Sequence, residues 1–231
     1  MYLSRLVLNP RSRQVQHELA DPYELHRTIS HAFSNGVFQV ERKEDNATNI
    51  LFRVDLHPRT RIPTLLVQSR QKPEWGFLSV DRKNYLLGEQ DLPLDMENPA
   101  LKEMDLQLRE GQLLAFRLRA NPTFKKTTEK EDGKKHKARL GIFREEDQHN
   151  WLKRKLESAG AALVSVNIVN EQFTRGKLFI EREKEKRLNF LSVQFDGLLQ
   201  VRDPNTLVNT IFTGFGSAKG LGFGLLSLAR A

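Results

Sequence analysis

The chain has 231 residues, 39% of them hydrophobic, and its 37 Lys and Arg against 29 Asp and Glu give a net charge of +8. This length allows one large domain or two small ones. The basic excess indicates nucleic acid or an acidic membrane face as a partner, with a merely basic protein as the alternative. Cysteine is absent, which excludes disulfides and thiolate metal sites. No run of about 18 apolar residues is present that would span a membrane, and we expect a cytoplasmic protein.

The first half of the chain predicts the order strand, helix, strand, strand. Apolar and β-branched residues at 2–8 predict a strand, and a basic loop is expected at 11–17. Asp21 and Pro22 suit the N-cap and first turn of a helix that reaches to about residue 34. The further expected elements are a polar connection at 37–45, strands at 49–56 and 64–69, a short helix near 73–75, and one more strand with a loop within 81–110.

The second half opens on the clearest strand pattern of the chain. Between residues 112 and 120, Leu114, Phe116 and Leu118 alternate with Arg117 and Arg119, which predicts a strand with one apolar face and one basic face. The further expected elements are a helix at 145–158, a strand at 163–169, a long hairpin with arms at 173–181 and 187–201, a helix at 205–212, and a final strand.

Two segments of this half concentrate positive charge. Residues 119–139 contain eight Lys and Arg against three Asp and Glu, and residues 175–187 contain six against three. Because 122–139 is also poor in apolar residues, it predicts a solvated loop, which after a basic strand could equally be a nucleic-acid arm. The second segment covers the tip of the predicted hairpin.

The order strand-helix-strand-strand-helix-strand is thus expected twice. This pattern predicts an α+β fold with two tandem ferredoxin-like (RRM-like) domains, at residues 1–110 and 111–231.

A glycine-rich loop lies near the end of the chain. Five of the 11 residues at 214–224 are glycine, and Lys219 is the only basic residue among them. Bare backbone amides beside one lysine suit a phosphate cradle, and the alternative is a tight turn packed against a helix. The spacing is not that of a P-loop. The order helix-loop-strand is also the reverse of the dinucleotide-binding motif, so no nucleotide cofactor is implied.

Six segments together resemble one family, and they occur in its order along nearly the whole chain. The matching segments are Met1-Tyr2-Leu3-Ser4, Tyr23-Glu24-Leu25-His26, Phe116 to Pro122, Trp151 to Leu156, Phe195-Asp196-Gly197, and Gly214 to Leu228. The family that they resemble is CasE, the CRISPR RNA-processing endoribonuclease subunit of type I-E Cascade.

The resemblance implies metal-independent cleavage of precursor CRISPR RNA at the base of the repeat stem-loop. The expected ends are a 2′,3′-cyclic phosphate and a 5′-hydroxyl. The enzyme is expected to stay bound to the crRNA stem-loop and to a Cascade backbone subunit, without a metal, a small-molecule cofactor or a membrane.

The family's catalytic histidine and tyrosine fall on His26 and Tyr23. Histidine titrates near neutral pH and serves as an acid or a base, and a tyrosine hydroxyl orients a 2′-hydroxyl or a phosphate. A histidine near a helix start is by itself more often structural, so the family pattern carries this assignment. His31 is a further candidate, although its spacing places it off the face of His26. No histidine or carboxylate spacing typical of a metal site occurs.

The RNA-binding residues are expected on the catalytic helix, the basic strand, the following helix, the hairpin and the glycine loop. They are Arg27, Arg119, Asn121, Lys125, Lys126, Lys153, Arg175, Lys177, Arg182, Lys184, Lys186, Arg187, Gly214, Gly216, Lys219, Gly220 and Gly222.

A non-catalytic RNA-binding module with the same two domains is the alternative. RRM modules usually stack bases on aromatic residues of a conserved string, and this chain has no such string. A membrane-surface protein is disfavoured because no helix pairs a lysine-rich face with an aromatic one.

Overall fold

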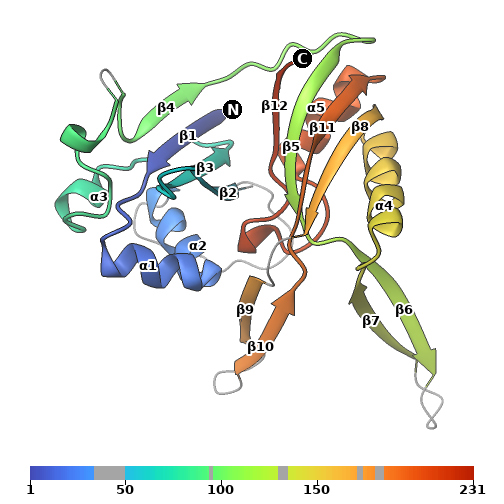
Figure 1. Ribbon diagram of the computed structural model, residues 1–231, viewed down its shortest axis with the longest axis horizontal. Coiled ribbons are helices and arrows are strands. Elements are labelled where there is room, and N and C mark those ends of the chain that lie inside the picture. Colours follow the sequence, from blue (N-terminus) through green and yellow to red (C-terminus); the bar gives the residue numbers. More distant parts are fainter. Residues whose placement is uncertain (34–49, 94–95, 130–134, 171–173, 180–184) are drawn as a thin grey trace.

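The computed structural model describes residues 1–33, 50–93, 96–129, 135–170, 174–179 and 185–231. The polar connection expected at 37–45 lies outside these residues. Two four-stranded antiparallel sheets stand side by side, and two smaller ribbons project from the second of them (Figure 1).

The first sheet has the strand order β2-β3-β1-β4, with every neighbouring pair antiparallel. Since helices lie between β1 and β2 and between β3 and β4, this is the ferredoxin-like arrangement. Its strands are β1 (Tyr2–Val7), β2 (Leu51–Leu56), β3 (Pro63–Ser69) and β4 (Ala100–Glu103).

The helices of the first domain differ from the prediction in one place. The expected loop at 11–17 is wrong, because Ser12 caps a helix there and accepts a hydrogen bond from the amide of Val15. That helix is short, and it is held by burying Val15 and Glu18 against its neighbours. The first-domain helices are α1 (Arg13–Ala20), α2 (Pro22–Ser30), the 3₁₀ turn η1 (His31–Phe33), the single-turn α3 (Phe77–Val80) and the 3₁₀ turn η3 (Glu89–Asp91).

The second sheet repeats the topology, with the order β12-β5-β11-β8 and antiparallel neighbours. The tandem ferredoxin-like fold predicted from the sequence is therefore confirmed. The first sheet ends at Glu103 and the second begins at Leu113, so a domain division after residue 110 is our proposal. The elements are β5 (Leu113–Ala120), α4 (Glu145–Ser158), β8 (Ala161–Asn170), β11 (Val193–Val201), α5 (Pro204–Thr213), the 3₁₀ turn η4 (Lys219–Leu221) and β12 (Leu226–Arg230).

Both basic segments form antiparallel ribbons, which corrects two predictions. The expected loop at 122–139 is a ribbon of β6 (Thr123–Glu129) and β7 (Lys135–Gly141). The expected long hairpin is shorter, because its second arm divides into β10 (Glu185–Phe190) and β11. Only β10 pairs with β9 (Thr174–Phe179), whereas β11 enters the second sheet. Both ribbons extend below the second domain in Figure 1 and diverge from each other.

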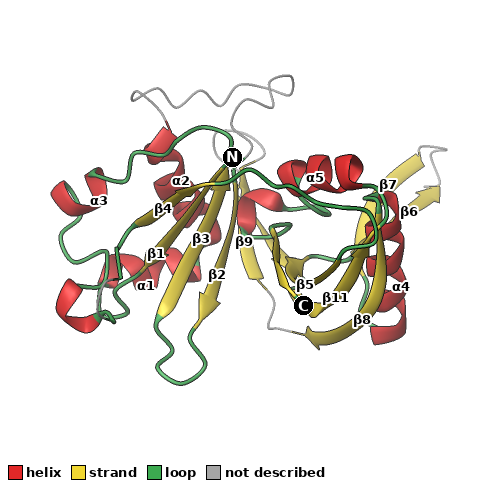
Figure 2. Cartoon of the chain, turned by 90° about the horizontal axis from the view of Figure 1, so that it is seen from above, coloured by secondary structure: helices red, strands yellow, loops and turns green. Residues whose placement is uncertain are grey.

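Figure 2 shows α1 and α3 beside the first sheet and α4 beside the second, each on the side away from the other domain. Each domain has its own apolar core. In the second core, Trp151, Leu152 and Leu156 of α4 are buried, as predicted. The domains are also joined by polar contacts, among them a 2.9 Å hydrogen bond from Gln68 of β3 to the carbonyl of Ile211 in α5. Among the described residues, no helix is long and apolar enough to cross a membrane.

A buried carboxylate ties the first-domain helices together. Glu18 of α1 is 4% exposed and accepts hydrogen bonds from the hydroxyl of Thr28 on α2, at 2.8 Å, and from Arg82, at 2.8 Å. Tyr85 donates its hydroxyl to the other carboxylate oxygen at 2.5 Å, and burial together with this bond raises the pKa of Tyr85. The cluster therefore fixes α2 relative to α1 and to the segment after α3.

Replacing Tyr85 with Phe should lower the free energy of unfolding by about 2 kcal/mol, because a buried hydrogen bond to a charged acceptor is lost. Chemical denaturation of the two proteins measures this difference. The control is Tyr2→Phe, which removes a phenol hydroxyl from half-buried β1 and should have a much smaller effect. Equal effects of the two substitutions would contradict this role of Glu18.

Candidate active site

Helix α2 presents His26 at the boundary between the two domains. Asp21 caps the helix by accepting the amide of Tyr23 at 3.2 Å, and Leu25 and Ile29 bury its inner face. His26 lies beside that inner face and is half-buried. Its ring stacks on Phe52 of β2, with the ring centroids 6.0 Å apart and the planes 28° from parallel. The imidazole is thus held by the first domain's own strand.

The glycine loop at 214–224 packs tightly against this strand. Gly214 has φ +78°, and a Cβ there would lie 2.7 Å from a methyl carbon of Leu51. A Cβ at Gly222, with φ +84°, would lie 3.2 Å from the ring of Phe52. Both positions therefore need glycine for conformation and for space. The packing alternative expected a helix as the neighbour of this loop, whereas at these two glycines the neighbour is strand β2.

The backbone of the glycine loop lies close to the imidazole of His26 at Gly220, which has no side chain. A Cβ at Gly220 would lie 4.0 Å from Nε2 of His26, and η4, which contains Gly220, packs against α2. The histidine comes from the first domain and the loop from the second. Two features that are almost 200 residues apart in the sequence therefore face each other, and among the described residues outside its own turn, a Cβ at Gly220 would meet no atom other than Nε2 within 4 Å.

Burial lowers the pKa of two titratable groups of this site, His26 and Lys219. Desolvation lowers the pKa of His26, so the imidazole is neutral at neutral pH. Desolvation, followed by the charge of Lys155, also lowers the pKa of Lys219. The ammonium of Lys219 donates to the carbonyl of Thr213 at the C-terminus of α5, which anchors the lysine to the loop.

Lys155 is a candidate that the sequence prediction missed. Trp151 packs on the loop, since a Cβ at Gly216 would lie 3.3 Å from its ring. Lys155 follows Trp151 by four residues and so lies on the same face of α4, toward Lys219. The predicted Lys153 is exposed on another face of α4. The four-residue spacing from a buried tryptophan was the available signal.

The other predicted residues of α2 and η1 have different surroundings. Tyr23 is 37% exposed and, three residues from His26, is its neighbour on the helix surface. Arg27 is exposed and paired with Glu24. His31 begins η1, and its ring lies 6.1 Å from that of Phe77, whereas His26 stacks on Phe52.

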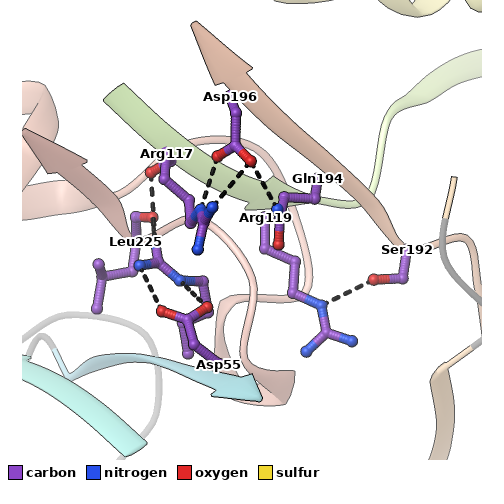
Figure 3. Close-up of polar contacts among 8 residues, drawn as sticks. Asp55, Arg117, Arg119, Ser192, Gln194, Asp196 and Leu225 are labelled. Carbon is purple, nitrogen blue, oxygen red and sulfur yellow. Dashed lines mark hydrogen bonds and ion pairs between the residues drawn. The ribbon is translucent and has the colours of Figure 1, made fainter. Parts of the chain in front are cut away.

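Strand β5 carries Arg119 to the end of the loop. Its Nε donates to the hydroxyl of Ser192 at 2.9 Å (Figure 3). Its guanidinium lies 5.8 Å from the ring centre of Phe223, which belongs to the glycine loop. Asn121, two residues later, is buried with 6% exposed. The remaining predicted residues of this part, Lys125 and Lys126, are exposed on β6.

The second ribbon reaches the candidate site, because β9 packs against α2. Arg187 of β10 pairs with Lys177 of β9 in the ribbon's register. The strands also contain Arg175 and Lys186, whereas the predicted Arg182 and Lys184 lie outside the described residues. Within the described part of the chain, no group of three or more His, Asp or Glu side chains lies close enough to hold a metal ion.

Comparison with known proteins decides the family. A family profile described as "CRISPR associated protein" matches residues 1–230. The chain belongs to this family. The CRISPR-associated endoribonuclease Cse3 of Thermus thermophilus is 35% identical over 99% of this chain and 100% of its own length. The Cascade subunit CasE of Escherichia coli is 30% identical over 99% of both chains. The predicted resemblance to CasE is thus confirmed.

A solved structure supports the same relationship. Thermus thermophilus Cse3, bound to an RNA representing a pre-cleavage complex, superposes with a TM-score of 0.72 and 33% identity. The match covers 99% of this chain and 98% of that CRISPR-associated protein.

The lowered pKa of His26 predicts a pH dependence of stability. Just below the ordinary histidine pKa of 6.5, the unfolded chain binds a proton at this position that the folded chain does not bind. Acidification from neutral pH therefore lowers the free energy of unfolding of the wild type. His26→Gln should show a smaller loss, measured by denaturation across this range, and an unchanged slope would contradict the assignment.

Proposed function

We propose that this CRISPR-associated protein is an endoribonuclease that cleaves precursor CRISPR RNA at the base of each repeat stem-loop. The observation that carries the proposal is the neutral imidazole of His26 facing the bare glycine backbone at Gly220. The names of the relatives, an endoribonuclease and a Cascade subunit, agree with it. The protein then stays bound to the crRNA stem-loop, beside a backbone subunit of Cascade.

The chemistry needs no group from outside the RNA and the protein. His26 accepts the proton of the RNA 2′-hydroxyl, and the 2′-oxygen attacks the adjacent phosphorus while the bond to the 5′-oxygen breaks. The protonated His26 then gives this proton to the leaving 5′-oxygen, which leaves 2′,3′-cyclic phosphate and 5′-hydroxyl ends and returns the imidazole to its neutral form. Tyr23 orients the reacting group by hydrogen bonding, and His31 is at most an assisting group. Cleavage is accordingly independent of metal ions.

The loop stabilises the crowded phosphate. Backbone amides around Gly220 and the ammonium of Lys219 supply hydrogen bonds and positive charge where the phosphate gains negative charge. Lys155 adds a second charge from α4 on the same side. Gly214, Gly216 and Gly222 contribute by letting the loop approach Leu51, Trp151 and Phe52.

The β6–β7 and β9–β10 ribbons bind the stem of the RNA. A helical stem is recognised through its shape and phosphates, which suits two basic ribbons that extend on the same side of the second domain. The proposed phosphate contacts on them and on the neighbouring elements are Arg27, Arg119, Lys125, Lys126, Lys153, Arg175, Lys177, Arg182, Lys184, Lys186 and Arg187, with Asn121 holding the strand end.

A cleavage assay tests the enzyme claim against the non-catalytic binding module. In excess EDTA, wild type should cut a CRISPR-repeat hairpin RNA once, and His26→Ala should leave it uncut while binding it equally well. Denaturing gels show the cut, and phosphatase sensitivity of the product ends reports the cyclic phosphate. Binding without cleavage by wild type would establish the module instead.

Substitution of the two lysines of α4 tests which of them contacts an RNA phosphate. The structure favours Lys155, whereas the sequence predicted Lys153. Lys155→Ala should weaken hairpin binding more than Lys153→Ala and should reduce the log–log salt slope by about 1, as expected for one lost phosphate contact. Fluorescence anisotropy over a salt series measures both quantities. The opposite order would favour Lys153 as the phosphate contact.

A further inference from the structure

A buried arginine joins the two domains at the exit of the glycine loop. Arg53 of β2 is 2% exposed, and its Nε and NH2 groups donate to the two carboxylate oxygens of Asp55 at 2.8 and 2.9 Å. Its NH1 group donates to the backbone carbonyls of Arg117 at 3.2 Å and Leu225 at 3.3 Å, both in the second domain.

Three successive residues of β2 contact the loop along its length. Leu51 packs on Gly214, where the loop begins, and Phe52 packs on Gly222. Arg53 binds the carbonyl of Leu225, directly before β12. Side chains alternate along a strand, so Leu51 and Arg53 face the second domain while Phe52 faces α2. Strand β2 therefore sets the position of the whole loop.

The same strand sets the position of the imidazole. Phe52 stacks on His26 on one side and touches Gly222 on the other. Any shift of β2 along the loop would move this ring and change the distance between His26 and Gly220. Arg53 adjoins Phe52, and it binds β2 to the loop's exit by directional hydrogen bonds rather than by apolar packing alone.

We propose that Arg53 is a positioning residue. It holds His26 and the glycine loop at the relative position that cleavage requires. It acts through Phe52 and the Leu225 carbonyl and touches no RNA. The inference rests on the proposed endoribonuclease function. Arginine suits the role because its planar fork binds a carboxylate and two carbonyls at once, which the single ammonium of lysine cannot do.

Single-turnover cleavage of the repeat hairpin in EDTA tests the role with Arg53→Met and Arg53→Lys. The rate constant reports the geometry of folded enzyme, whereas the amplitude reports the fraction that is folded and active. Affinity is measured separately, with a hairpin that lacks the 2′-hydroxyl at the cut. Arg117→Met is the control, because it also removes a bidentate Arg–Asp pair, on the exposed face of β5, and keeps the carbonyl that Arg53 binds.

Both Arg53 variants should lose rate by about 100-fold, the effect of misplacing a reacting group by an ångström, with amplitude and affinity unchanged. Arg117→Met should cleave at the wild-type rate. A loss of amplitude alone, a parallel loss of affinity, or equal loss in the control would overturn the positioning role. Wild-type rates in both Arg53 variants would overturn it while leaving the proposed function intact. If wild type itself does not cut, the proposed function fails and the positioning role falls with it.

Discussion

The packing of one edge strand against the glycine loop is the constraint on which the candidate site depends. Strand β2 lies at the edge of the first sheet, and Leu51, Phe52 and Arg53 contact the loop in turn. Because bulky side chains fill this boundary, the loop must be glycine at Gly214 and Gly222. The two domains thus meet through a close fit of backbone against side chain, and His26 lies at its edge.

The packing at this boundary gives His26 a fixed ring position and a neutral imidazole, which a histidine that acts as a general base requires. The stacking of His26 on Phe52 holds the ring, and its burial keeps the imidazole neutral. Gly220 leaves the space beside Nε2 open. The lysines lie around the same opening, where Lys155 and Lys219 repel each other and a bound phosphate would relieve that repulsion. Within one loop, Gly214, Gly216 and Gly222 thus pack against side chains, whereas Gly220 faces the imidazole.

Local patterns predicted the regular elements well and the basic segments poorly. The α4 helix begins and ends where the sequence indicated, because apolar periodicity and a following glycine mark it. The β6–β7 ribbon was expected to be a loop, because mostly polar residues occupy both faces of its strands and no apolar face marks them in the sequence. Helix α1 was missed for a similar reason, as a buried carboxylate, Glu18, holds its inner face.

By itself, the sequence determined the tandem ferredoxin-like fold and the family, because both follow from the order of segments along the chain. It also placed Tyr23 and His26 as neighbours on one helix, because that follows from their three-residue spacing. Only the tertiary structure decided that His26 faces Gly220, that Lys155 lies toward Lys219, and that Arg53 joins the domains. The first and third of these contacts link residues of different domains, and the second links α4 to the glycine loop of the same domain. No local pattern encodes which side chains meet when distant segments of the chain pack together.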